Sequence, residues 1–125
     1  MRRHLFFLLC ALLALSLASC RHFIKSHTDI TISESGHYFK MLAWYNRDKT
    51  TSVEEYMDHT IGRRNKTSFI NSRIDGTLGF DDHTTFYIKK YPGYLEIKLD
   101  KNKNSSESHH RVKNMCEGLK NVMAN

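Results

Sequence analysis

Residues 84–100 read TTFYIKKYPGYLEIKLD, and this stretch decides the fold. Two runs rich in β-branched and aromatic residues, 84–91 and 94–100, are separated only by Pro92 and Gly93,. Proline presets the first central dihedral of a type II turn, and glycine accepts the positive φ of the second. The sequence therefore predicts an antiparallel hairpin. Alternation places two opposite sets of side chains on its faces: Phe86, Ile88, Leu95, Ile97 and Leu99 on one, and Tyr87, Lys89, Tyr94, Glu96 and Lys98 on the other.

Further strands are predicted on the N-terminal side of this hairpin. Residues 30–32 alternate weakly between apolar and polar, and residues 37–45 form a stronger, aromatic-rich strand,. Residues 67–74 are predicted to form the next strand, ended by an Asp75-Gly76 turn signal, and residues 77–80 fit either a short return strand or an irregular loop,. The strand at 37–45 has two faces: Phe39, Met41, Ala43 and Tyr45 on one, and Tyr38, Lys40, Leu42 and Trp44 on the other.

Two amphipathic helices are predicted. Residues 52–55, Ser-Val-Glu-Glu, fit a capping box, and Gly62 suits a left-handed stop, so the first helix covers about ten residues,. The second spans 107–123 after the N-cap candidates Ser105 and Ser106,. Its Gly118 would permit close approach to the sheet. The apolar stripes are Val53, Tyr56, Met57 and Ile61 in the first helix, and Val112, Met115, Cys116, Leu119 and Val122 in the second,.

The element order is β-β-α-β-β-β-α. It predicts an α+β fold with a mostly antiparallel sheet of about five strands and two helices packed on one face. Residues 28–125 are long enough for a single domain with its own core. Cys116 is the one cysteine in this range, so the domain has no internal disulfide, and its place on the apolar stripe predicts a buried thiol,.

The N-terminus has the pattern of an export signal. Basic residues at 2–4 precede fourteen uncharged residues, 5–18, which are rich in leucine and phenylalanine,. This apolar run is too short to cross a bilayer, which takes about 20 residues. The exit, Leu17-Ala18-Ser19-Cys20, resembles the lipobox of bacterial lipoproteins. The resemblance implies cleavage between Ser19 and Cys20, and attachment of diacylglycerol to the Cys20 thiol.

The resemblance also implies a place in the cell. Residues 1–19 would be removed as the signal peptide, and residues 20–27 would form a lipidated N-terminus and short tether. Several acyl chains, such as palmitate, make membrane attachment effectively permanent. Arg21 stands where an aspartate would favour the inner membrane, so in a Gram-negative host the outer membrane is favoured. Removing Arg2 and Arg3 leaves 17 basic against 13 acidic residues, a mildly basic net charge of +4.

The outer face of the hairpin is the main candidate binding face. If the helices cover the opposite face, a set of tyrosines and lysines points outward: Tyr87, Lys89, Tyr91, Tyr94 and Lys98. One register of the neighbouring strand would add Tyr38, Lys40 and Trp44. Such side chains can stack on sugar rings and pair with phosphates. The alternative is cross-strand pairing that only stabilises a solvent-exposed face. Nucleic acid is not a suitable ligand for an exported chain, which leaves a glycan, a lipid headgroup or a protein.

Other groups of residues in the sequence give weaker indications of function. A second, basic candidate surface comprises Arg63, Arg64, Lys66, Lys101 and Lys103. The histidines lack the spacing of a zinc site, and no nucleophile motif is present, so we expect no metal, no cofactor and no catalytic residue. The sequence therefore favours a non-enzymatic envelope lipoprotein that binds a protein or glycan. The alternative is a lipid-anchored enzyme or enzyme inhibitor, although the basic charge argues against inhibition of lysozymes, which are themselves basic.

Overall fold

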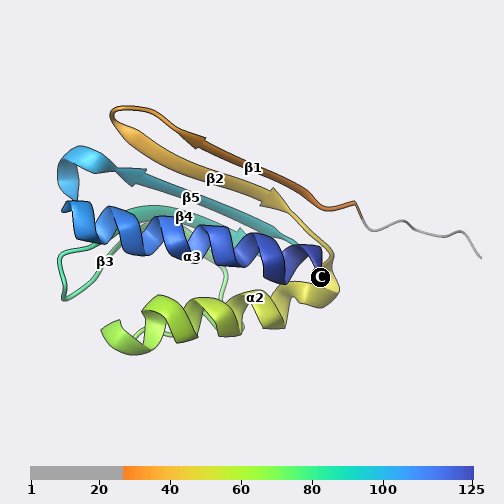
Figure 1. Cartoon of the computed structure of the whole chain (residues 1–125). Helices are drawn as coiled ribbons and strands as arrows, with labels where there is room; N and C mark the ends of the chain where they lie inside the picture. The colour runs from red at the N-terminus through yellow and green to blue at the C-terminus, as the bar shows by residue number, and fades with distance from the viewer. Residues whose placement is uncertain (1–26) are drawn as a thin grey trace, which may run out of the picture.

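The computed structural model describes residues 27–125. The predicted signal peptide, its cleavage site and Cys20 lie outside the described residues. Within the described part, five antiparallel strands form one open sheet, and α-helices α2 and α3 lie together on one side of it (Figure 1). The predicted α+β fold and element order are confirmed.

The sheet has the strand order β1-β2-β5-β4-β3, so the 84–100 hairpin lies at its centre. Gly93 has a φ of 82°, the positive value that the Pro92-Gly93 turn needs,. The centre of the sheet is therefore built from neighbouring segments of the chain, with the β1-β2 hairpin added along β5. The strand bounds are β1 Asp29–Glu34, β2 Tyr38–Trp44, β3 Ile74–Gly79, β4 Thr85–Tyr91 and β5 Tyr94–Asp100.

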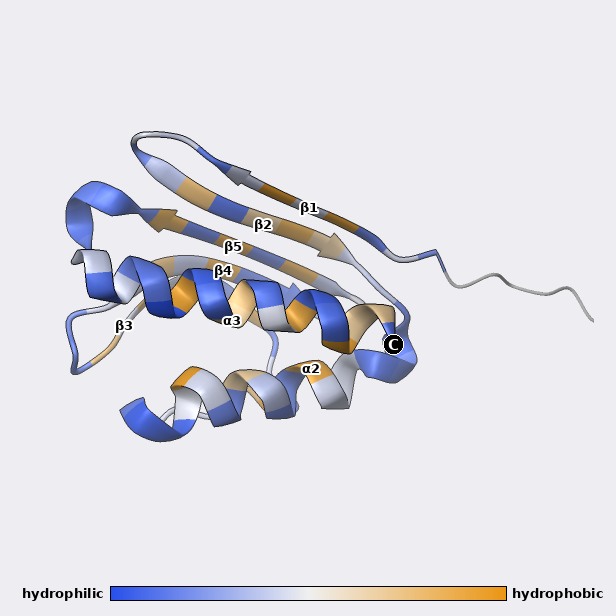
Figure 2. Ribbon diagram, in the orientation of Figure 1, coloured by the Kyte–Doolittle hydropathy of each residue, from blue (hydrophilic) through white to orange (hydrophobic). Residues whose placement is uncertain are grey.

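The helices cover the face that alternation predicted to be apolar. Helix α2 (Thr50–Met57) continues through a π turn at Asp58–Gly62. Helix α3 (Ser106–Ala124) is capped by Ser105, whose side chain accepts a hydrogen bond from Ser108 N. Hydrophobic and hydrophilic residues alternate along strands and helices alike, as expected of elements with one buried face (Figure 2),. The largest fully buried side chains lie between helices and sheet: Phe39, Phe69, Phe86, Met41, Met57, Ile88, Leu95, Ile97, Leu99, Leu119, Met123 and Val53.

The first helix differs from its prediction at both ends. Asn46 accepts a hydrogen bond from Asp48 N and begins a 3-10 turn at Arg47–Lys49, so α2 starts at Thr50 and Ser52 lies inside it. The prediction of a capping box at residues 52–55 was therefore wrong. Gly62 is helical, and Lys66 takes the left-handed position with a φ of 54°. Gly62 is instead a close-approach residue, because a Cβ there would lie 2.5 Å from Thr67 O.

The predicted strand at 67–74 was also wrong. The Asp58 carboxylate accepts hydrogen bonds from Phe69 N at 2.6 Å and from Ser68 Oγ at 2.9 Å. The Phe69 N–H group is therefore not available to pair with a neighbouring strand. The strand runs instead over Ile74–Gly79, so Asp75 and Gly76 lie within it and do not form a turn.

Gly118 approaches a helix rather than the sheet. A Cβ at this position would lie 1.8 Å from the Tyr56 hydroxyl of α2, so Gly118 makes room for the contact between the two helices. The stripe of α3 also ends differently from its prediction, since Met123 is buried and Val122 is only partly so.

Candidate functional site

Within residues 27–125, no helix covers the sheet face opposite α2 and α3, and we call it the open face. Strand alternation places the candidate residues of β4 and β5 on it: Tyr87, Lys89, Tyr91, Tyr94 and Lys98. The register of β2 against β5 pairs Trp44 with Tyr94 and Lys40 with Lys98. The open face therefore also includes Tyr38, Lys40 and Trp44. Tyr38 and Trp44 are among its most exposed large side chains, at 43% and 49%.

An aromatic cluster of Trp44, Tyr91 and Tyr94 occupies one end of the open face. Tyr91 stacks on Tyr94 at 4.7 Å with an interplanar angle of 10°, and Trp44 meets Tyr94 edge-on at 4.5 Å. Tyr94 is consequently only 8% exposed, although alternation directs it outward. Burial, followed by its hydrogen bond to Glu96, raises the pKa of Tyr94 to about 12. Tyr94 thus supports the cluster, and Trp44 is the member that presents a free surface.

The remainder of the open face carries polar pairs across neighbouring strands. Lys40 lies 3.5 Å from Glu96, and the Tyr87 hydroxyl donates to Asp75 at 2.8 Å. The Lys98 ammonium lies 4.3 Å from the centre of the Tyr38 ring. Such pairs each stabilise a sheet modestly. The open face is thus an ordered, mixed surface of aromatic rings and charges.

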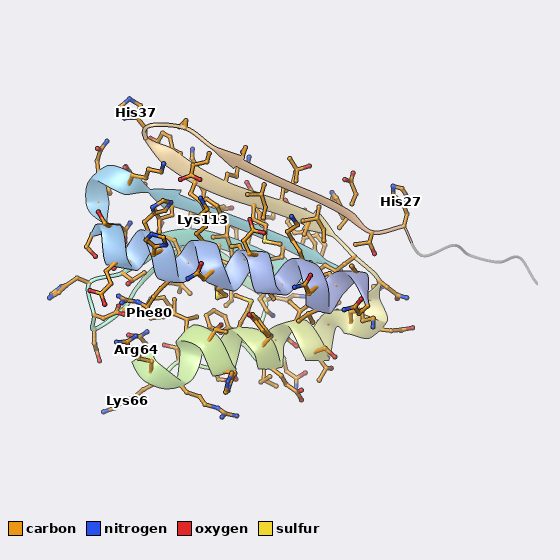
Figure 3. The ribbon with its side chains drawn as sticks, in the orientation of Figure 1. His27, His37, Arg64, Lys66, Phe80 and Lys113 are labelled. Atoms are coloured by element: carbon orange, nitrogen blue, oxygen red, sulfur yellow. The ribbon has the colours of Figure 1, made fainter. Side chains whose placement is uncertain are left out.

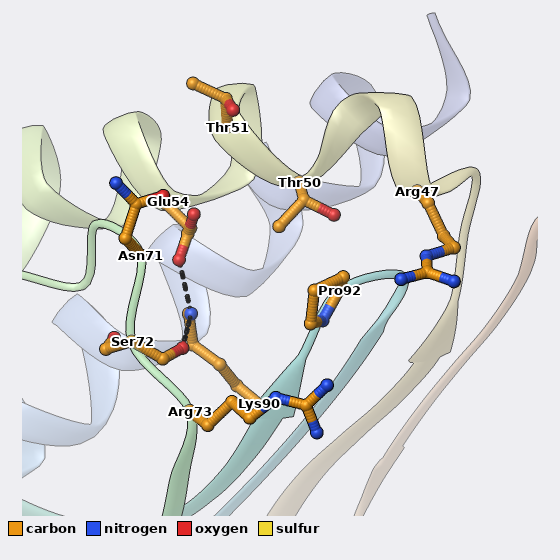
Figure 4. Close-up of a pocket in the computed structure, with 9 residues that line it drawn as sticks. All are labelled: Arg47, Thr50, Thr51, Glu54, Asn71, Ser72, Arg73, Lys90 and Pro92. Carbon is orange, nitrogen blue, oxygen red and sulfur yellow. Dashed lines mark hydrogen bonds and ion pairs between the residues drawn. The ribbon is translucent and has the colours of Figure 1, made fainter.

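A cavity of about 420 Å³ lies at the same end of the domain as the aromatic cluster, between the start of α2, the loop before β3 and the β4–β5 turn. Its floor is an ion pair between Lys90 and Glu54, whose side chains are 3% and 4% exposed (Figure 4). Lys90 also donates to the carbonyl of Ser72. The cavity is lined by Arg47, Thr50, Thr51, Glu54, Asn71, Ser72, Arg73, Lys90 and Pro92.

Sequence reasoning missed this cavity, although one signal was present. In β4, alternation places Lys90 on the same inward side as Phe86 and Ile88. A lysine at an inward position needs a buried anion, because a charge without a partner in a protein interior is costly. Glu54 fills that need from α2, and nothing in its local sequence marks it.

The basic candidate surface is partly committed to structural contacts. Lys101 and Lys113 each lie 2.8 Å from Glu34, and His109 lies 3.0 Å from it. Lys101, first through its hydrogen bond, and then Lys113 lower the pKa of Glu34 to about 2. They tie the end of edge strand β1 to α3. Arg64 and Lys66 lie after α2, at the end of the domain opposite His27 (Figure 3).

Metal and thiol chemistry have little support in the described part of the chain. No group of three or more His, Cys, Asp or Glu residues in 27–125 is arranged to hold a metal ion. Cys116 is buried, and burial raises the pKa of its thiol to about 12, so it stays protonated and unreactive at neutral pH,. None of the helices within the described range is long and apolar enough to span a bilayer.

Comparison of the chain with protein-family models, with characterised proteins and with solved structures found no match.

Proposed function

We propose that this protein is an exported lipoprotein, anchored through acyl chains on Cys20, whose domain binds a protein or glycan of the cell envelope without acting as an enzyme. The observation that supports binding is the open face. Both helices pack on the other side of the sheet, and the uncovered side presents Trp44 and Tyr38 at about half exposure beside lysines. Aromatic rings of this kind dominate the buried centres of binding interfaces.

The anchor and the open face fit one another. A lipid on Cys20 restricts the domain to a membrane surface, where a weak binding face is assisted by the high local concentration of partners. Arg21 at the second mature position favours the outer membrane in a Gram-negative host. Nucleic acid is not a proposed partner.

The anchor is tested by metabolic labelling with a fatty-acid (palmitate) probe. We expect Cys20→Ser to abolish labelling. Cys116→Ser is the matched control, because it removes the other cysteine that would remain after signal cleavage, and labelling should persist in it. Unchanged labelling of Cys20→Ser would refute the lipoprotein proposal.

The binding face is tested by site-specific photo-crosslinking in intact cells. A photoreactive residue at Tyr38, on the open face, should give a discrete adduct with a protein or glycan. The same residue at Asn121, exposed on α3, is the control and should not. Adding the substitution Lys98→Ser, which alters the neighbour of position 38, should weaken the adduct. Equal crosslinking from both positions, or none from Tyr38, would contradict the proposed face.

A further inference from the structure

One end of the domain is defined by where the chain leads back to Cys20. Asp29 opens β1 and pairs with Trp44 at the end of β2, and Trp44 pairs with Tyr94 beside the β4–β5 turn. His27 lies at this end, and the start of α2 lies there too (Figures 1 and 3). We call it the tether end, and its surface residues of interest are Trp44, Arg47, Arg73 and Tyr91.

Two arginines at the tether end are free to bind an anion. Arg47 and Arg73 line the 420 Å³ cavity, and within residues 27–125 neither forms an ion pair with a carboxylate. Their guanidinium groups lie on the Pro92 side of the cavity, away from the Lys90–Glu54 pair (Figure 4). Because that pair is neutral as a unit, the cavity keeps the positive charge of both arginines. A guanidinium fork is well suited to a phosphate.

The same end carries aromatic rings of the kind found at membrane–water interfaces. Trp44 is 49% exposed, and the Arg73 guanidinium lies 6.0 Å from the centre of the Tyr91 ring. Tryptophan and tyrosine favour the headgroup level of a bilayer because their rings are apolar with one polar edge. Arginines beside them add attraction to anionic lipids.

The tether keeps this end close to the membrane. From Cys20 to Asp29 the chain spans nine residue steps, which extend at most about 30 Å,. We infer that the tether end rests on the bilayer that holds the Cys20 lipid, with Arg47 and Arg73 bound to phospholipid phosphates and Trp44 at headgroup level. This inference depends on the proposed lipid anchor.

The docked orientation determines which part of the open face is accessible. Tyr38 and Trp44 lie at opposite ends of the seven-residue strand β2, about 20 Å apart at 3.3 Å per residue,. With Trp44 at the headgroups, Tyr38, Tyr87 and Lys98 stand away from the membrane. The part of the open face that remains for an envelope partner is therefore the part distant from the aromatic cluster.

Trp44 is the only tryptophan in the chain, so its fluorescence reports this surface alone. The full lipidated protein is reconstituted into vesicles of phosphatidylcholine and phosphatidylglycerol, some carrying lipids brominated close to the headgroup. We expect bromine quenching and a blue shift of Trp44 emission. Arg47→Gln and Arg73→Gln should each weaken docking about fivefold, and together about 25-fold. Arg63→Gln with Arg64→Gln, on the segment that follows α2, is the matched control and should leave quenching unchanged.

The outcomes separate the anchor from the docking. Protein that does not float with the vesicles contradicts the anchor. Protein that floats while Trp44 stays unquenched, or is quenched equally in the Arg47/Arg73 variant, overturns the docking alone. Inorganic phosphate added to the protein in detergent is the remaining arm. A change in Trp44 emission with phosphate, without quenching by brominated lipid, would identify a free-anion site and overturn the lipid assignment.

Discussion

Removing one member of the buried Lys90–Glu54 pair should destabilise the domain more than any surface change. In Glu54→Leu, the Lys90 ammonium keeps the Ser72 carbonyl as its acceptor but loses its counter-charge, at a position only 3% exposed. Breaking a buried pair in this way costs about 3–5 kcal/mol. This is a large part of the ~5–15 kcal/mol by which such domains are stable. Lys90→Met leaves the carboxylate alone and should cost a similar amount.

The double variant distinguishes a buried pair from two independent residues. Glu54→Leu with Lys90→Met removes both charges and fills the space with apolar atoms, an exchange that is often close to neutral. The Ser72 carbonyl loses its donor, which adds about 1–3 kcal/mol. The double variant should therefore be more stable than either single variant. As a control, Lys40→Met breaks the exposed Lys40–Glu96 pair and should cost no more than ~1 kcal/mol,.

Urea unfolding of residues 21–125, followed by Trp44 fluorescence and circular dichroism, measures these free energies. The transition must be reversible and the slope with urea unchanged among the variants. Single variants that each cost under ~1 kcal/mol, with a double variant equal to their sum, would refute the buried-pair reasoning. That result would mean that Lys90 reaches solvent and that the cavity floor is not formed.

Three further predictions concern the core, the thiol and the response to acid. Ile97→Asp places a carboxylate at a fully buried position and should unfold the domain in thermal melts,. Lys98→Ser, on the open face, should change the free energy of unfolding by less than ~0.5 kcal/mol. Equal losses of stability in the two variants would reverse the assignment of the inner and outer faces. The Cys116 thiol, buried and with a pKa of about 12, should react with a disulfide reagent slowly in the native protein and rapidly in urea; rapid native labelling would place it at the surface. Glu34 has a pKa of about 2, below its ordinary 4.5, so its contribution to the stability of the fold is complete above about pH 4.5 and is lost as the pH falls towards 2,. Glu34→Gln should flatten this acid-dependent loss of stability. An unchanged dependence of stability on pH would show that the contacts of Glu34 with Lys101 and Lys113 do not hold.

Much of the fold followed from local patterns in the sequence. The alternation in 94–100, the Pro92-Gly93 turn and the stripe of α3 each carry their own signal, and the structure confirms them. The segment between α2 and β3 could not be predicted, because contacts distant in sequence decide it. Asp58 hydrogen-bonds the backbone of Phe69, eleven residues away, and this interaction outweighs a strand propensity at 67–74.

The candidate surface was predictable in outline and not in detail. Alternation places Tyr94 on the open face, but its burial depends on Trp44 in β2, and the register between strands is fixed only in three dimensions. The cavity depends on three separate segments, 47–54, 71–73 and 90–92, which have no shared motif. Arg47 and Arg73 are ordinary surface arginines in the sequence, and only the fold shows that they line one cavity.

The way stability is distributed between the two faces of the sheet makes the proposed function testable. The apolar core lies between the sheet and the helices, and on the open face only Tyr94 is buried. Changes at Tyr38 or Lys98 should therefore leave the folded domain intact, since surface substitutions rarely cost more than ~0.5 kcal/mol. A protein that loses its partner through such a change has lost recognition rather than structure. Tyr94 is the exception, because removing its ring withdraws the support beneath Trp44, and a Tyr94 variant would change stability and surface together.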